Sequence, residues 1–123
     1  MKDFKLIDSS VWVSYLINGD YQNIIDTEEI LLLSVLSIFE IEKRLLKEKL
    51  SANVVKNSMD FIKKRSLIIE VNVEIVEKAV QISLEKNLPA IDALIYSSTL
   101  INKAKLITLD NDFRNLGGVE ILN

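Results

Sequence analysis

Five acidic residues of this sequence stand where a carboxylate can do chemistry. Asp8 directly follows an apolar run, Glu40 and Asp92 lie within apolar stretches, and Asp110 comes shortly after another apolar run, with Asp112 close behind it. A carboxylate in an apolar neighbourhood is unfavourable unless it has a partner. Clustered carboxylate oxygens select Mg²⁺ or Mn²⁺, and such an ion can activate water and neutralise charge on a phosphoryl group. If these acids converge, the chemistry they indicate is metal-assisted hydrolysis.

The chain contains no histidine and no cysteine. A Ser-His-Asp triad, an imidazole base and an HExxH zinc site are therefore excluded. Disulfides and thiolate zinc sites are excluded as well, and a reducing cytoplasm is the compartment that we expect. Any hydrolysis must rely on carboxylates, hydroxyls, lysine and whatever metal the carboxylates bind.

Composition predicts one compact domain spanning residues 1–123. Hydrophobic residues make up 49% of the 123-residue chain, there is one proline, and no linker or internal repeat interrupts it. No apolar run approaches the roughly 20 residues needed to span a bilayer, so no membrane is expected. The net charge of −3 argues against wholesale coating of a polyanion. Local phosphate contacts stay open, because basic residues cluster in residues 43–49 and 56–65.

Apolar runs and helical periodicity alternate along the chain. Short apolar runs predict strands at residues 4–7, 30–33, 67–71, 106–108 and 119–121. Helical spacing predicts helices at residues 11–17, 35–49, 54–62, 75–84, 90–104 and 112–116, with a break at 50–53 and a helix start at Pro89. Strands alternating with helical crossovers imply a mostly parallel sheet covered by helices on both faces, a three-layer α/β/α fold.

This arrangement brings the acids together. Open parallel sheets place their sites outside the carboxyl ends of the strands. Asp8, Glu40, Asp92 and Asp110 all fall shortly after predicted strands or in the helices that follow them. We therefore expect their carboxylates to lie on one rim of the sheet.

Each acid also has a purely local explanation. Asp8 taken alone is better explained as a helix N-cap, and Glu40 as the last residue of a capping box that begins at Ser37. Asp92 can complement the positive end of a helix dipole, and Asp110 and Asp112 can form an ordinary turn. Local capping does not, however, predict convergence on one rim. Converging carboxylates repel one another and become tolerable when a cation lies among them.

At these residues the chain resembles the PIN-domain family nearly from end to end. Residues 6–11 (Leu-Ile-Asp-Ser-Ser-Val) resemble the family's opening strand, and residues 37–41 (Ser-Ile-Phe-Glu-Ile) resemble its second motif. Residues 88–93 (Leu-Pro-Ala-Ile-Asp-Ala) resemble the third motif, and residues 106–113 (Leu-Ile-Thr-Leu-Asp-Asn-Asp-Phe) the fourth. One such motif is a weak signal, whereas four in order at ordinary spacing are a strong one.

The resemblance implies a metal-dependent endoribonuclease that uses a water nucleophile and Mg²⁺ or Mn²⁺. Small members of the family are mostly toxin subunits of VapBC-type toxin–antitoxin pairs, so it also implies a homodimer and a small antitoxin partner. The implied site residues are four catalytic and metal-binding acids, one accessory metal acid and three supporting hydroxyls, namely Asp8, Glu40, Asp92 and Asp110, then Asp112, then Ser9, Ser10 and Thr108.

Other classes of protein fit less well. A response-regulator receiver needs an acidic pair after the first strand and an aspartate after the third, but two serines follow Asp8, and Asn72 follows the third predicted strand. A dehalogenase-like phosphatase needs Asp-x-Asp after the first strand, which is also missing. A catalytically idle PIN-like module that only binds a partner protein remains the alternative, and retention of all four acids argues against it.

Several other residues have less specific readings. Trp12 and Tyr15 are better explained as core or dimer contacts than as a base-stacking platform. The basic clusters are better explained as solvated helix faces, and Tyr96 fits the site and the core equally well. Six apolar residues exceed what two helices of a small domain need to bury, which predicts a homodimer or antitoxin interface; they are Leu45, Leu46, Val54, Val55, Phe61 and Ile62.

Overall fold

Five parallel strands form the central sheet of the computed structural model, which describes residues 4–122. The strand order across the sheet is β3-β2-β1-β4-β5. The strands are β1 (Phe4–Ile7), β2 (Leu31–Ser34), β3 (Ser66–Ile69), β4 (Ala104–Thr108) and β5 (Val119–Ile121). The mostly parallel sheet predicted from the sequence is confirmed, and every pairing within it is parallel.

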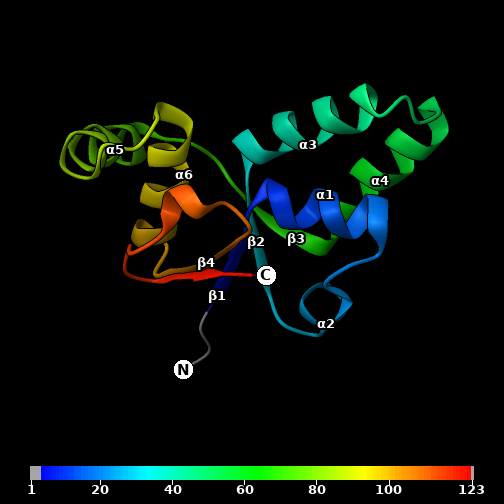
Figure 1. Cartoon of the computed structure of the whole chain (residues 1–123), viewed down its shortest axis with the longest axis horizontal. Coiled ribbons are helices and arrows are strands. Elements are labelled where there is room, and N and C mark those ends of the chain that lie inside the picture. The colour runs from blue at the N-terminus through cyan, green and yellow to red at the C-terminus, as the bar shows by residue number, and fades with distance from the viewer. Residues whose placement is uncertain (1–3, 123) are drawn as a thin grey trace.

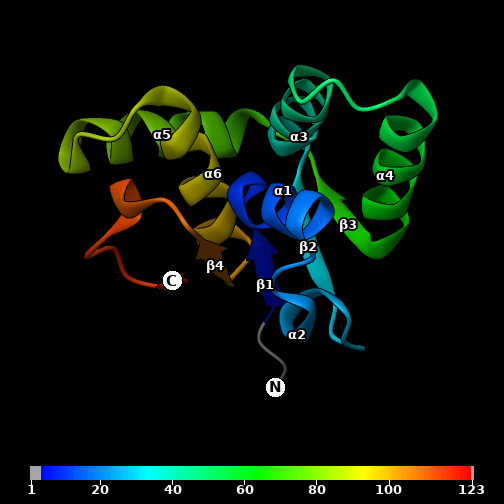
Figure 2. The same ribbon diagram turned by 45° about the vertical axis from the view of Figure 1, so that its right-hand side comes forward.

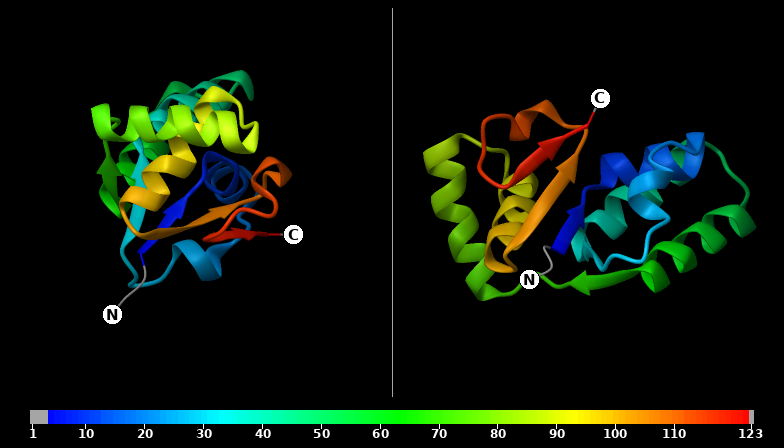
Figure 3. Two further views of the ribbon diagram at one scale, coloured as in Figure 1. Left: turned by 90° about the vertical axis from the view of Figure 1, so that its left-hand side faces the viewer. Right: turned by 90° about the horizontal axis from the view of Figure 1, so that it is seen from below.

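Helices cover both faces of this sheet, as Figures 1 and 2 show. Figure 3, viewed from below, places α5 and α4 on opposite sides of the strands. The helices are α1 (Ser9–Asn18), α2 (Gln22–Ile25), α3 (Val35–Lys47), α4 (Ala52–Arg65), α5 (Val73–Lys86) and α6 (Ala90–Ile101), with a 3₁₀ turn η1 (Asn111–Phe113). The predicted three-layer α/β/α architecture is therefore confirmed.

Alternation along the strands produces two cores, one on each face. Leu31 and Leu33 of β2 join the core beneath α1, α3 and α4, whereas Leu32 joins the core beneath α5 and α6. Neighbouring Leu6 and Ile7 of β1 divide between the two cores in the same way. Successive side chains of a strand point to opposite faces, so a continuous apolar run is what a sheet buried on both faces requires.

The element boundaries differ from the predicted ones at several places. The helix α1 begins at Ser9, two residues before the first apolar position, because hydroxyl residues fill its first turn. The short helix α2 was not predicted, since four residues show no periodicity. The helix α6 ends at Ile101, where Asn102 caps it and Lys103 takes a left-handed conformation that turns the chain into β4. The predicted helix over residues 112–116 is the 3₁₀ turn η1.

The strand order creates a topological switch point beside β1. The chain proceeds from β1 to β2 and β3 on one side and then crosses to β4 and β5 on the other. The crevice outside the carboxyl ends of such strands is where open parallel sheets bind ligands. Asp8 directly follows β1 and Asp110 follows β4, so both acids lie at this crevice.

Within residues 4–122, none of the helices has both the length and the apolar composition that crossing a bilayer requires.

Candidate metal-binding site

Asp8 occupies the N-cap position of α1, yet its side chain does not cap the helix. Its Oδ2 atom instead accepts hydrogen bonds from Ser10 Oγ and Thr108 Oγ1, each at 2.8 Å. The side chain is buried, with the residue 7% exposed. A buried carboxylate needs such donors, and here they come from two different elements. The capping explanation of this residue therefore accounts for its backbone only.

Hydroxyl groups tie the end of β1 to the end of β4. Thr108 Oγ1 donates to Asp8 and accepts the backbone N–H of Asp110 at 3.0 Å. Ser10 Oγ accepts the backbone N–H of Leu109, also at 3.0 Å. Both side chains thus orient an acid and the loop that carries the next acid. The sequence suggested Ser10 and Thr108 as supporting residues, and the structure places both in contact with Asp8.

Glu40 lies in the second turn of α3 and faces α1. Ser9 Oγ donates to Glu40 Oε1 at 3.2 Å. The alternative explanation by a capping box at Ser37 is wrong, because α3 begins at Val35 and its N-cap is Ser34, whose hydroxyl accepts the N–H of Leu36. Burial raises the pKa of Glu40 above its usual value, and the nearby Asp8 and Asp110 add to this rise, while the Ser9 hydrogen bond opposes it.

Asp92, Asp110 and Asp112 form the tightest group of acids. Each offers a carboxylate oxygen within 4.8 Å of the others. Asp92 lies in the first turn of α6, after Pro89, which occupies the N-cap position. Burial, and after it the charges of Asp110, Asp8, Asp112 and Glu40, together raise the pKa of Asp92 to about 6. The four other acids therefore lie near enough to Asp92 to repel its charge.

The turn explanation of Asp110 holds together with a role in the site. Asp110 Oδ1 accepts the backbone N–H of Asp112 at 2.9 Å and so caps η1. This bond turns the chain sharply and brings the carboxylate of Asp112 back toward Asp92. The carboxylate of Asp110 has two oxygens, so capping through one is compatible with metal binding through the other.

Repulsion among these acids is not relieved by any cation in the described part of the chain. No salt bridge formed within residues 4–122 involves any of the five acids. Their donor set consists of carboxylate oxygens supported by hydroxyls, which fits a hard divalent cation. The structure thus brings Asp92, Asp110 and Asp112 within reach of one metal ion, with Asp8 and Glu40 nearby, and this arrangement can hold such an ion.

Two aromatic side chains near the site belong to the core, Tyr96, which the sequence left open, and Trp12. Tyr96 is buried, and its hydroxyl donates to the carbonyl of Gly117 at 2.7 Å. Trp12 is fully buried and packs edge-on against Tyr15 and Phe61. Neither residue therefore offers a free ring to a ligand, in agreement with the core explanation of Trp12.

A polar groove that was not predicted from the sequence lies between α1 and α3 and begins at Glu40. Its cavity measures about 380 Å³. The signal that could have revealed it is the four-residue spacing of polar side chains on both helices, which places them on one face of each. The groove is lined by Ser9, Ser10, Val13, Ser14, Asn18, Glu40 and Arg44.

Comparisons with known proteins agree with this geometry. The sequence model of the PIN domain matches residues 5–119. Among solved structures, a toxin–antitoxin complex from Klebsiella pneumoniae is similar, with a TM-score of 0.80, 19% identity, and 94% of this chain and 95% of that chain covered. VapBC2 from Rickettsia felis, bound to a promoter DNA fragment, has a TM-score of 0.78 and 15% identity, with 98% of each chain covered.

A third similar structure is VapC20 from Mycobacterium tuberculosis, described as a toxin that cleaves the sarcin–ricin loop. Its TM-score is 0.74 at 15% identity, with 97% of this chain and 99% of that chain covered. No curated protein sequence matches the chain significantly. At such low identities the structural matches establish the fold, whereas the sequence model covers nearly the whole chain. The chain belongs to the PIN-domain family.

Proposed function

We propose that the protein is a divalent-metal-dependent endoribonuclease. The observation that supports this most is the group of Asp92, Asp110 and Asp112 at the topological switch point, with Asp8 and Glu40 nearby and no salt bridge within residues 4–122 to relieve their repulsion. PIN-domain membership supports nuclease chemistry. The absence of histidine leaves carboxylates and bound metal as the means of activating water.

In this proposal Asp92, Asp110 and Asp112 hold Mg²⁺ or Mn²⁺, and Asp8 and Glu40 complete the acidic rim. When bound, the metal supplies an activated water and neutralises charge on the phosphoryl group. Ser10 and Thr108 fix the orientation of the Asp8 carboxylate through two hydrogen bonds.

Glu40 is our candidate to accept a proton from the attacking water, because Asp92, Asp110 and Asp112 would hold the metal. Its raised pKa brings it closer to neutrality than an ordinary glutamate, as a general base requires. Ser9, which donates a hydrogen bond to Glu40 Oε1, holds this carboxylate toward the rim.

We further propose that the substrate is RNA and that the protein acts as the toxin of a toxin–antitoxin pair. One similar structure is a toxin that cleaves the sarcin–ricin loop, and two others are toxin–antitoxin assemblies. These likenesses in fold motivate the assignment.

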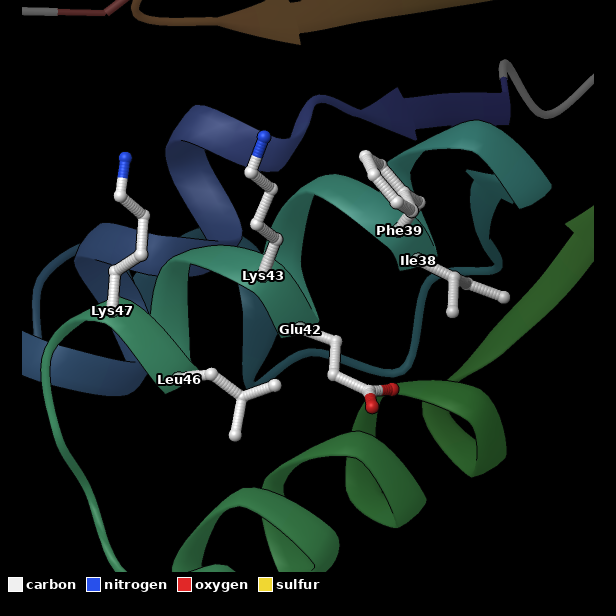
Figure 4. A pocket seen from close by; sticks show the side chains of 6 residues that line it. All are labelled: Ile38, Phe39, Glu42, Lys43, Leu46 and Lys47. Atoms are coloured by element: carbon white, nitrogen blue, oxygen red, sulfur yellow. The ribbon is translucent and has the colours of Figure 1, made fainter.

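An exposed apolar surface on α3 and α4 is our candidate site for the antitoxin. Phe39 is 67% exposed beside Glu40, and Leu46 and Val54 are about half exposed. Figure 4 shows Leu46 and Glu42 projecting toward α4 along this surface. A protein segment lying here would sit next to the acids, which is where a neutralising partner would act. Of the six apolar residues singled out from the sequence, Leu45, Val55 and Ile62 are core residues.

A second apolar surface, on α5 and α6, is our candidate for homodimer formation. Leu84 is 81% exposed and Val80 is 57% exposed. The cavity between the two helices has about 340 Å³, and none of the residues that line it is charged. Surfaces of this composition are typical of contacts between identical subunits.

The experiment that tests the nuclease proposal is a cleavage assay on a pool of single-stranded RNA in Mn²⁺. Single changes Asp8→Asn, Glu40→Gln, Asp92→Asn and Asp110→Asn should each lower the rate by at least about a hundredfold, because each removes a charge from the metal site. Circular dichroism serves as the folding control. If the folded Asp8→Asn variant cut RNA as fast as the parent, the cleavage would belong to a contaminant or to another site. A parent protein that never cleaves would favour the idle partner-binding module.

A further inference from the structure

We infer that the polar groove between α1 and α3 binds the sugar–phosphate backbone of the RNA beside the cleaved bond, with Arg44 as its phosphate contact. The inference rests on the proposed ribonuclease function and specifies where the strand runs. The phosphate contact, Arg44, lies outside the acidic rim, which the groove reaches at Glu40.

Two polar stripes face each other across the groove. On α1 the stripe consists of Ser10, Ser14 and Asn18, which are spaced four residues apart and therefore share one face of the helix. On α3 the stripe consists of Glu40 and Arg44, again four residues apart. The two helices pack against each other, as Figures 1 and 2 show.

The lining of the groove fits a sugar–phosphate backbone. It offers the guanidinium of Arg44 and the amide of Asn18, beside the Glu40 carboxylate, three serines and Val13 as its single apolar residue. The serine hydroxyls donate to the carboxylates of Glu40, Asp8 and Asp20, and their oxygens can still accept from ribose hydroxyls. The guanidinium and the amide can donate to phosphate oxygens. A docked protein segment would instead need apolar lining. The groove on the other side of α3 provides more of it, because Ile38, Phe39 and Leu46 lie there beside three charged side chains.

Charge explains why a cation is needed at this place. Five carboxylates stand at the rim, so an approaching phosphate meets repulsion until it finds positive charge nearby. Arg44 is the one cation among the described residues that line the groove, and it follows Glu40 by one helical turn, about 5.4 Å. A phosphate held there is therefore a close neighbour of the one under attack. A guanidinium can also grip a phosphate through two parallel hydrogen bonds.

Arg44 is available for this contact. Its Nε donates to Glu48 Oε1 at 3.0 Å, and both side chains are about half exposed, at 57% and 43%. Exposed pairs four residues apart on a helix are weak and are readily exchanged for a stronger partner. Glu48 thus holds the guanidinium near the groove without locking it.

The test compares Arg44→Ala with Lys56→Ala in kinetics on a defined single-stranded RNA in Mn²⁺. Lys56 is the matched control, because it also pairs with an acid four residues on, Asp60, and lies on α4 outside the groove. Arg44→Ala should raise KM about tenfold and leave kcat within about twofold, since it removes one charge-assisted contact. Lys56→Ala should change neither constant by more than about twofold.

Two further variants distinguish phosphate binding by Arg44 from a merely structural role of this residue. Arg44→Lys should recover part of the lost affinity, because it keeps the charge but not the paired hydrogen bonds. Glu48→Gln should lower KM, since it frees the guanidinium, and this gain should vanish when combined with Arg44→Ala. The slope of log(kcat/KM) against log salt should fall in magnitude by about 0.7 in Arg44→Ala.

A scan of single methylphosphonate linkages locates the contact. Neutralising one linkage adjacent to the cleaved bond should weaken the parent about tenfold and leave Arg44→Ala unaffected at that position. Equal sensitivity of parent and variant at every linkage would overturn the inference, as would an Arg44→Ala variant that behaves like Lys56→Ala.

Binding of labelled RNA in Ca²⁺, followed by fluorescence anisotropy, separates this inference from the nuclease proposal. Arg44-dependent binding without cleavage in Mn²⁺ would refute the nuclease proposal and uphold the groove. Cleavage by the parent with no effect of Arg44→Ala on either binding or KM would refute the groove inference and uphold the nuclease proposal. Absence of both cleavage and RNA binding would refute both.

Discussion

At the scale of single residues, the five acids differ in how the fold holds them. Asp8 is buried and accepts hydrogen bonds from two hydroxyls, whereas Asp112 is exposed, and the pKa of Asp92 is raised to about 6. The sequence suggested a minor role for Asp112, because a turn explained it as well as a metal did. Its carboxylate lies within 4.8 Å of those of Asp92 and Asp110, so we now assign it a larger part in metal binding.

Asp92→Asn should have opposite effects on stability without and with metal. The folded-state pKa of about 6 lies above the ordinary 3.8, so Asp92 favours folding fully below about pH 4, and this stability is lost as the pH rises through 6. In EDTA, the Tm of the variant relative to that of the parent should therefore rise between pH 4.5 and pH 7.5. We expect the change in the relative free energy of unfolding to be about 1 kcal/mol after allowance for solvent screening, which corresponds to a change in Tm of roughly 4 °C.

Millimolar Mn²⁺ at pH 7.5 should reverse this order. A ligand that binds only the folded state stabilises it, and the parent has the full set of acids to bind the metal. Differential scanning fluorimetry across pH, with and without Mn²⁺, measures both effects. A parent Tm indifferent to Mn²⁺ would contradict the metal site, and a pH-independent difference in EDTA would contradict the raised pKa of Asp92.

At the scale of elements, the strands and the edge of the sheet that carries the acids could both be predicted from the apolar runs of the sequence. Continuous apolar runs such as residues 31–33 of β2 are what a doubly covered parallel strand requires, and parallel strands end on the same side. The approach of Asp112 to Asp92 was not predictable, because it depends on the tight turn that Asp110 caps. The capping box at Ser37 failed because Ser34, three residues earlier, provides an equally good cap.

The two serines near the start of α3 should respond differently to replacement. Ser34 is buried and its hydroxyl accepts the N–H of Leu36, so Ser34→Ala should lower the free energy of unfolding by about 1 kcal/mol. The hydroxyl of Ser37 is buried without a hydrogen-bond partner in the described part of the chain. Ser37→Ala should therefore be neutral or stabilising.

Urea denaturation of the two alanine variants and the parent provides the measurement. Ser37→Ala is the matched control, because it deletes the same hydroxyl three residues further along the same helix. A capping box would produce the opposite ranking, with Ser37→Ala the more destabilised. That ranking would show that α3 begins later in solution than the structure places it.

At the scale of the whole molecule, the sheet separates two exposed apolar surfaces. The α3–α4 surface begins at Phe39 beside the acids, and the α5–α6 surface carries Val80 and Leu84 on the other face of the sheet. Exposed apolar patches of this kind mark contacts with other proteins. Two separate surfaces allow a homodimer and a neutralising partner to bind at once.

Replacement of one exposed leucine on each surface should distinguish their roles. Leu84→Glu places a charge in the uncharged α5–α6 surface, and we expect it to convert a dimer into a monomer because a buried unpaired charge is costly. Leu46→Glu makes the same change on α3 and should leave the dimer intact. Light scattering coupled to gel filtration measures the mass of each variant, with circular dichroism as the folding control. A parent that is monomeric at high concentration would refute the dimer, and a monomeric Leu46→Glu variant beside a dimeric Leu84→Glu variant would move the dimer contact to α3.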